Sequence, residues 1–145
     1  MAVTVKKVSL WRTEVENKPG ALARTIEPPA KAGADFKIIM GYRHAAASEK
    51  AVIEVFPITG KKVVAAAGVA GLTAAAIPAL LVEGDNRPVL ACSVAQAIAD
   101  AGINIAFLVA QVVARKFAAV VGFETDEDAT RAMPIIQKAA RGSKA

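Results

Sequence analysis

One short turn in this chain of 145 residues combines residue types that can hold a carboxylate group. Asn17-Lys18-Pro19-Gly20 stands between an alternating stretch and a helical one. Proline presets the backbone for a turn, and glycine lets another group approach the backbone closely. The first amides of the helix that follows have no partner within the helix and carry partial positive charge. This turn is therefore suited to binding a carboxylate without a dedicated arginine.

An acidic residue, Asp35, follows the helix that the turn begins and precedes the next apolar stretch. We expect Asp35 to lie beside the turn, where its carboxylate would receive an ammonium group. The turn and Asp35 together would then bind a zwitterion. The residues leave a second interpretation open, in which the segment is a plain helix cap followed by a surface turn.

The turn occurs twice in the chain. Asn17-Lys18-Pro19 recurs as Asn86-Arg87-Pro88, and Ala32-Gly33-Ala34-Asp35 recurs as Ala101-Gly102-Ile103-Asn104, both at an offset of 69 residues. Landmarks in the same order at one offset indicate two homologous units of about 70 residues. We therefore predict two modules in tandem, one over residues 1–76 and one over residues 77–145.

The two modules share one series of expected elements. Alternation of apolar and polar residues predicts strands, and apolar residues at helical spacing predict helices. The expected strands cover residues 7–16, 35–42, 51–56, 72–76, 79–83, 104–113 and 117–123. One helix follows each turn and another follows each strand pair. The last helix begins at Thr125 and three acidic residues, a sequence typical of a helix start.

The second module has no fourth strand after its last helix, which the sequence pattern ends at about Ala140. The strand expected at 72–76 in the first module maps onto residues 3–7 at the offset of 69. We therefore predict that residues 2–7 supply the last strand of the second module.

Glycine and proline predict how the first helix of each module ends. Gly33 and Gly102 stand where a left-handed residue closes a helix. Pro28 and Pro29 lie inside the helical stretch of the first module, so we expect a kink or a break there.

The repeated landmarks resemble those of a known family. NKPGAL followed by AGADF, and DNRPVL followed by AGINI, are similar to the D/N-x-P-G-x-L and G-I-N-I landmarks of ACT domains. The resemblance covers almost the whole chain as two copies. It implies an α+β fold of two ferredoxin-like β-α-β-β-α-β modules with antiparallel sheets. It also implies regulatory modules that commonly bind amino acids at an interface between modules, against the first turn and the start of the second strand.

Carried onto this sequence, the resemblance implies one set of ligand-binding residues in each copy. The first copy contributes Asn17, Pro19, Gly20, Ala21, Leu22 and Asp35, and the second contributes Asp85, Asn86, Pro88, Val89, Leu90 and Asn104. The second copy departs from the family pattern, because Val89 replaces the glycine and the spacing between Pro88 and Leu90 is one residue short of that pattern. A β-branched residue disfavours a positive φ, so we expect the first copy to hold the ligand turn.

These features predict a regulatory protein that is not an enzyme and that binds a small amino acid. No nucleophile–base pair or metal set is visible, and Cys92 is the single cysteine, so we expect no metal and no cofactor. Residues 103–110 are apolar at every position except Asn104, which suggests that the sheet is covered on both faces and that the chain forms a homodimer. A regulated enzyme is a further expected partner.

Two other function classes stay open. The first is a structural interaction module whose ligand turns have decayed, which Val89 favours. The second is a basic ferredoxin-like nucleic-acid binder, favoured by a net charge of +5. Because the basic residues are scattered and the strands carry few stacking aromatic residues, we expect no nucleic-acid partner.

A run of 20 residues without a charge, Val63–Val82, is long enough to cross a bilayer. It is mostly alanine and valine and contains Gly68, Gly71 and Pro78, which weaken a spanning helix. We interpret it as a buried helix that leads into a buried strand. The N-terminal residues lack the apolar stretch of a secretory signal, so we expect a cytoplasmic protein without a membrane partner.

Overall fold

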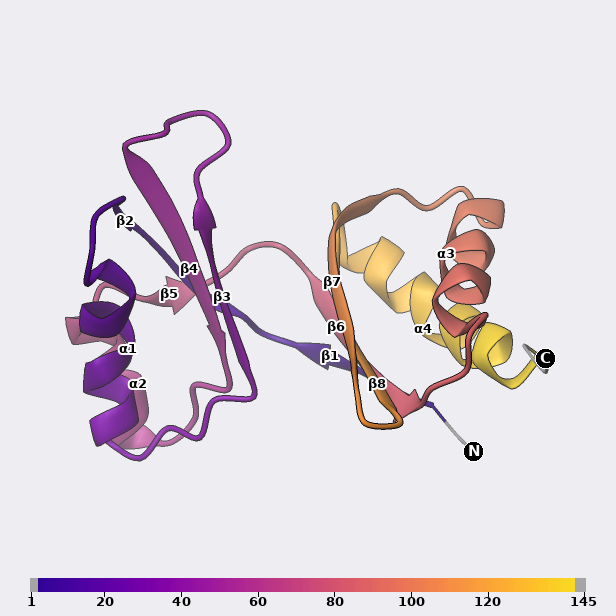
Figure 1. The fold of residues 1–145 in the computed structure, drawn as a ribbon, viewed down its shortest axis with the longest axis horizontal. Helices are drawn as coiled ribbons and strands as arrows, with labels where there is room; N and C mark the ends of the chain where they lie inside the picture. The colour runs from indigo at the N-terminus through magenta and orange to yellow at the C-terminus, as the bar shows by residue number, and fades with distance from the viewer. Residues whose placement is uncertain (1–2, 143–145) are drawn as a thin grey trace. The chain divides into compact units, whose positions relative to one another are not determined.

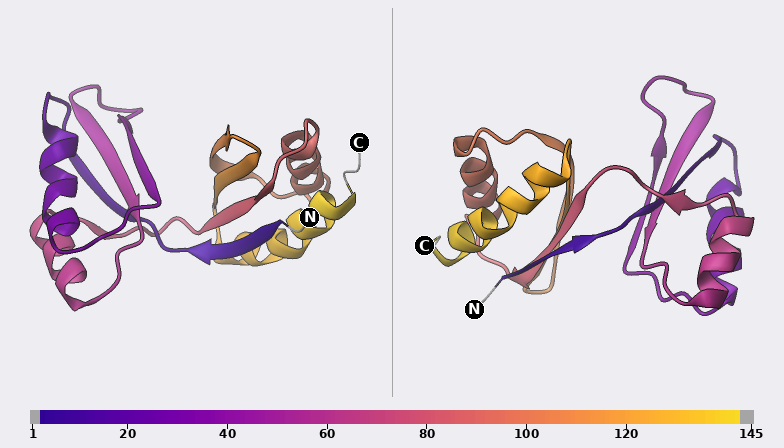
Figure 2. Two further views of the ribbon diagram at one scale, coloured as in Figure 1. Left: turned by 60° about the horizontal axis from the view of Figure 1, so that its bottom comes forward. Right: turned by 180° about the vertical axis from the view of Figure 1, so that it is seen from behind.

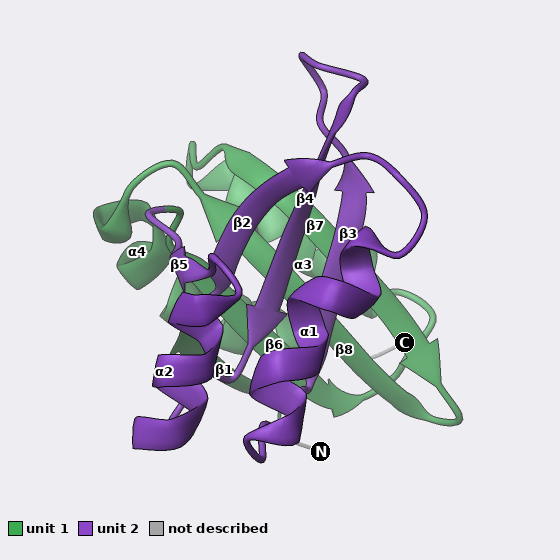
Figure 3. Cartoon of the chain, turned by 90° about the vertical axis from the view of Figure 1, so that its left-hand side faces the viewer, with its two compact units in different colours: residues 1–8, 77–145 green, residues 9–76 purple. Residues whose placement is uncertain are grey.

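A computed structural model of the protein describes residues 3–142. The chain divides into two compact units (Figure 3). The first module is Ser9–Ala76, which is unit 2 in the figure, and the second module combines Ile77 onward with the N-terminal residues up to Val8. Each module is a four-stranded antiparallel sheet with two helices, which confirms the α+β fold of two tandem ferredoxin-like modules.

The first module has a sheet in the strand order β3-β4-β2-β5. Its elements are β2 (Trp11–Glu16), α1 (Ala21–Lys31), β3 (Ile38–Arg43), β4 (Lys50–Phe56), α2 (Lys61–Val69) and β5 (Thr73–Ala74). Both helices lie on the same face of this sheet (Figures 1 and 2). The core between helices and sheet contains Ile53 and Val55 of β4, Val63 and Ala67 of α2, and Leu72.

The second module has a sheet in the strand order β1-β6-β8-β7. Its elements are β1 (Thr4–Val8), β6 (Ala79–Asp85), α3 (Leu90–Asp100), β7 (Ile105–Val113), β8 (Lys116–Phe123) and α4 (Asp126–Gly142). The N-terminal strand β1 pairs antiparallel with β6 over five residues, from Thr4 opposite Glu83 to Val8 opposite Ala79. Residue 2 of the strand segment expected from the sequence lies outside the described residues.

The single strand predicted over residues 7–16 is wrong, because the structure has two strands there. Lys7 and Val8 end β1 and pair with β6, whereas Trp11 begins β2 and pairs with Val55 of β4. Leu10, between the two strands, is fully buried. The alternation of apolar and polar residues continues through both strands, so the sequence pattern does not show where the chain changes sheets.

The helix ends follow the glycine signals. Gly33 and Gly102 have φ values of 111° and 73°, and each closes its helix in a Schellman motif. In the first module the Ala34 amide donates to the Pro29 carbonyl at 3.0 Å. The break expected at Pro28 and Pro29 is wrong, since α1 continues through both prolines to Lys31. They lie in the last helical turn, so the two helical bonds that they cannot donate, to the carbonyls of Arg24 and Thr25, are lost close to the end of the helix.

The uncharged run of residues 63–82 contains most of α2, the turn at Gly71, β5 and the start of β6. None of the helices within residues 3–142 combines the length and the apolar character that crossing a membrane requires. The helix start expected at Thr125 is confirmed, because the Thr125 hydroxyl accepts a hydrogen bond from the Asp128 amide at 3.0 Å.

Candidate functional site

The turn of the first module joins the end of β2 to the start of α1. Gly20 has a φ of 88°, a left-handed conformation that favours glycine. The Ala21 amide donates to the Lys18 carbonyl at 3.2 Å, and the first helical bond runs from the Arg24 amide to the Gly20 carbonyl at 3.0 Å. The amides of residues 22 and 23 precede that first helical bond, so they lie at the positive end of the helix dipole.

Asn17 fixes the position of this turn. Its side-chain amide donates to the Ser48 carbonyl at 3.0 Å, and its backbone amide donates to the Glu49 carbonyl at 2.8 Å. Both bonds tie the turn to the loop between β3 and β4. Asn86 repeats the backbone part in the second module, where its amide donates to the Arg115 carbonyl at 2.8 Å. The side chain of Asn17 is thus engaged in holding the turn.

An arginine that the sequence interpretation did not include lies at this turn. The Nη2 atom of Arg24 is 3.5 Å from the Pro19 carbonyl oxygen, to which it donates. Its Nη1 atom lies 2.6 Å from the point that a Cβ atom on Gly20 would occupy. Residues four apart lie on the same side of a helix, so the spacing of Gly20 and Arg24 was a signal that could have identified this guanidinium.

A cleft of about 440 Å³ opens beside the turn, between α1, the end of β2 and the end of α2. It is lined by Val15, Glu16, Lys18, Ala21, Arg24, Thr25, Pro28, Val69 and Ala70. Lys18 Nζ lies 3.0 Å from Glu16 Oε2, and this hydrogen-bonded ion pair lowers the pKa of the Glu16 carboxyl group. The lining of the cleft therefore combines apolar side chains with charged side chains of both signs.

The short strand β5 leaves room for this cleft. It pairs only with Trp11 and Arg12 of β2, so on the side of β2 away from β4 no strand of the described residues pairs beyond Arg12. In the second module β1 pairs with five residues of β6 and covers the equivalent edge. The open part of β2 includes Val15 and Glu16, which line the cleft.

Asp35 does not lie beside the turn of its own module, so this expectation is wrong. Strands β2 and β3 both pair antiparallel with β4 and are therefore parallel to each other. Glu16 at the end of β2 is opposite Lys50, whereas Ile38 at the start of β3 is opposite Phe56 at the other end of β4. Asp35 precedes Ile38 and lies at the end of the sheet opposite to the turn.

Asn104 has the same relationship to the turn of the second module. It precedes β7, whose first residue Ile105 is opposite Phe123, while Asp85 at the end of β6 is opposite Lys116 at the start of β8. The side-chain amide of Asn104 donates to Glu124 Oε1 at 2.8 Å. In each module, the turn and the start of the second strand therefore lie at opposite ends of the sheet.

The turn of the second module differs from the first as the valine predicts. Val89 has a φ of −95°, outside the left-handed region. No residue is missing after Pro88, because α1 and α3 both span eleven residues and begin 69 residues apart, at Ala21 and Leu90. Leu90, which is fully buried, is thus the counterpart of the buried Ala21 and not of Leu22.

A salt bridge lies at the start of this second turn. Lys116 donates to Asp85, and this hydrogen bond lowers the pKa of the Asp85 carboxyl group. The guanidinium of Arg87 donates to the Ala140 carbonyl near the end of α4. These two contacts hold polar groups of the turn against the module itself.

Neither a protein-family model nor a curated protein sequence matches this chain. Solved structures do match it along most of its length. A protein from Bacteroides thetaiotaomicron superposes with a TM-score of 0.72 at 14% identity, covering 91% of this chain and 88% of that one. The regulatory subunit of aspartate kinase from Thermus thermophilus, in its ligand-free form, superposes with a TM-score of 0.62 at 15% identity, covering 96% and 97%.

The aspartate kinase of Clostridium acetobutylicum is similar to this chain over a part of its own length. The TM-score is 0.58 at 14% identity, and the match covers 96% of this chain but 34% of the kinase. At these identities the similarity defines the fold. The chain has the fold of two ferredoxin-like modules in tandem, as the two turn motifs predict.

Proposed function

We propose that this chain is a regulatory protein without catalytic activity that binds a small amino acid in the cleft of the first module. The observation that carries the proposal is the guanidinium of Arg24 placed over the Gly20 turn, at the positive end of α1. A ligand carboxylate would accept hydrogen bonds from Arg24 and from the first amides of the helix.

The rest of the cleft matches the other groups of an amino acid. Glu16 supplies a carboxylate for the ammonium group, in the place that Asp35 was expected to fill. Val15, Ala21 and Val69 offer apolar surface to a small side chain. The ligand-free regulatory subunit of aspartate kinase has the same fold, which supports a regulatory role and a partner enzyme for this chain.

The family resemblance also implies Asp35 and Asn104 as ligand-binding residues, and these two fit a binding site that is formed by more than one copy of the module. Asp35 and Asn104 lie at the opposite end of their sheets from the turns, so either can reach a turn only when it comes from another copy of the module. We propose a homodimer in which a second chain supplies such a contact. The turn residues Asn17, Pro19, Gly20, Ala21 and Leu22 are the first half of that site. Asp85, Asn86, Pro88, Val89 and Leu90 stand at the corresponding turn of the second module.

A thermal-shift screen of free amino acids tests the proposal. A ligand present at 100 times its dissociation constant stabilises the folded state by about 2.7 kcal/mol if it does not bind the unfolded chain. Arg24→Gln should weaken that response at least tenfold in apparent affinity, because the charge-assisted bond to the carboxylate is lost. Arg115→Gln, at an exposed turn of the second module, is the matched control and should respond as the wild type does.

A flat response to all amino acids would contradict the proposal and favour a structural interaction module without a ligand.

That second function has its own support in strand β7, an edge strand of nine residues without a charge. Leu108, Val109 and Val112 of β7 are each about half exposed. Uncharged apolar edges are surfaces on which another strand can add. We propose a cytoplasmic location for either function.

A further inference from the structure

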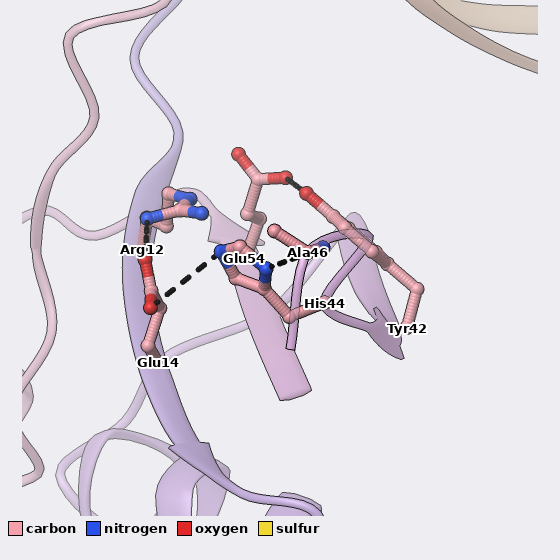
Figure 4. Close-up of polar contacts among 6 residues, drawn as sticks. All are labelled: Arg12, Glu14, Tyr42, His44, Ala46 and Glu54. Atoms are coloured by element: carbon pink, nitrogen blue, oxygen red, sulfur yellow. Dashed lines mark hydrogen bonds and ion pairs between the residues drawn. The ribbon is translucent and has the colours of Figure 1, made fainter. Parts of the chain in front are cut away.

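A group of polar side chains occupies the face of the first module's sheet that α1 and α2 do not cover (Figure 4). We call it the Glu54 cluster, and it consists of Arg12 and Glu14 of β2, Tyr42 of β3, His44 of the loop that follows β3, and Glu54 of β4. Successive side chains of a strand point to opposite faces. Because Ile53 and Val55 lie in the core under the helices, Glu54 points to the other face.

Glu54 is 1% exposed, and only one of its carboxylate oxygens has a partner. Its Oε2 accepts a hydrogen bond from the Tyr42 hydroxyl at 2.7 Å. Its Oε1 is buried and has no hydrogen-bond partner among the described residues. In Figure 4 this free oxygen points away from Tyr42. A buried carboxylate oxygen without a donor carries the full cost of its lost hydration.

The neighbouring guanidinium of Arg12 does not donate a hydrogen bond to Glu54 Oε1. Arg12 is opposite Glu54 in the strand register, but its Nη1 donates to Glu14 Oε2 at 3.0 Å. His44 does not supply a charge either. Its Nδ1 accepts a hydrogen bond from the Ala46 amide at 3.1 Å, so the imidazole is neutral and its Nε2, 3.7 Å from Glu14 Oε1, carries the proton. Two carboxylates thus face one guanidinium, and the cluster holds one excess negative charge.

The fold itself does not need these polar groups. In the second module the residues at the positions of Arg12 and Glu54 are Leu81 and Val120, which are opposite each other in the register and buried. The same sheet is therefore built with an apolar pair at this place. A buried glutamate at this place, opposite an arginine in the register, belongs to the first module and not to the second.

We propose that the Glu54 cluster binds the primary ammonium group of a small-molecule amine, with Glu54 Oε1 as the acceptor. An ammonium group offers three donors on a compact charge, so it can satisfy Oε1 and offset the excess negative charge of the cluster. The site is separate from the cleft at Gly20, since Glu54 and α1 lie on opposite faces of the sheet. The proposal stands whether or not the cleft binds an amino acid.

Methylammonium chloride tests this proposal, with tetramethylammonium chloride at equal ionic strength as the probe without N–H donors. Methylammonium should raise the unfolding midpoint of the full chain in a saturable manner, and tetramethylammonium should not. Glu54→Gln keeps an acceptor for Tyr42 and removes the charge, so it should abolish the methylammonium response. Glu49→Gln, at an exposed residue of the loop before β4, is the matched control and should keep the response.

The same variant separates a binding role from a structural one. Without any amine, Glu54→Gln should unfold at a higher temperature than the wild type, because an unpaired buried charge is removed. A lower midpoint would mean that the fold depends on the carboxylate and would count against the proposal.

Glu14→Gln gives a second variant that leaves Glu54 in place. It releases Arg12 to donate to Glu54 Oε1, so the apparent affinity for methylammonium should fall several-fold. Equal responses to the two cations, or an unchanged methylammonium response in both variants, would overturn the proposal.

Discussion

A Cβ atom on Gly20 would lie 2.6 Å from Arg24 Nη1, so a side chain at residue 20 fits only if the guanidinium of Arg24 moves away. The backbone of Gly20 is left-handed as well, with a φ of 88°. Glycine at this position therefore serves two purposes. It permits the turn, and it leaves space for the guanidinium beside the start of α1.

Gly20→Ala should separate these two purposes when it is compared with Gly102→Ala. Both glycines have positive φ, and a left-handed alanine costs about 1 kcal/mol. No atom of residues 3–142 lies within 4 Å of a Cβ on Gly102, whereas a Cβ on Gly20 displaces Arg24. Urea unfolding should show a similar loss of stability for both variants, and only Gly20→Ala should lower the response to an amino acid ligand. An equal ligand response in the two variants would refute the role of Arg24.

Removal of residues 1–6 should destabilise the second module and leave the first unchanged. The deletion removes three of the five β1 residues that pair with β6, and it takes Val3 and Val5 out of the second module's core. Burial of two valine side chains contributes about 3 kcal/mol. Hydrogen exchange should become faster at the amides of β6 and stay the same in β4, which is the internal control. Unchanged exchange in β6 would show that β1 contributes little to the module.

Tyr42 is the single tyrosine of the chain, so its ionisation can be followed directly by tyrosinate absorbance. Burial raises the pKa of Tyr42 to about 12, and its hydrogen bond to Glu54 acts in the same direction. A raised pKa in the folded state means that stability is fully present below pH 10 and is lost as the pH rises towards 12. The absorbance midpoint should therefore fall by about two pH units in urea, where tyrosine has its ordinary pKa of 10.0. A folded midpoint near pH 10 would contradict the hydrogen bond to Glu54.

The homodimer proposal predicts that a lysine on β7 lowers the oligomeric state. Val109 is about half exposed on this edge strand and pairs with Val120 of β8. Lysine on an edge strand opposes the addition of another strand. Light scattering should show a smaller mass for Val109→Lys than for the wild type. Val64→Lys, on the exposed side of helix α2, is the control. If both variants keep the wild-type mass, β7 is not the dimer contact.

Local signals in the sequence determined most of the elements. The repeat at an offset of 69 residues predicted two modules of the same fold, and the glycines at 33 and 102 marked the ends of α1 and α3. Val89 predicted a different turn in the second module. The signals of the two glycines and of Val89 depend on residues within one turn of helix, where propensity and capping act.

The tertiary structure alone decided which groups meet. Strand pairing joined residues far apart in the chain, so it separated Asp35 from the turn and divided residues 7–16 between two sheets. It also buried Glu54 between strands that carry Arg12 and Tyr42, although its place in an alternating strand looked ordinary. The alternation of a strand specifies that a side chain points to one of two faces. Only the pairing of that strand with its neighbours decides which groups share the face with it.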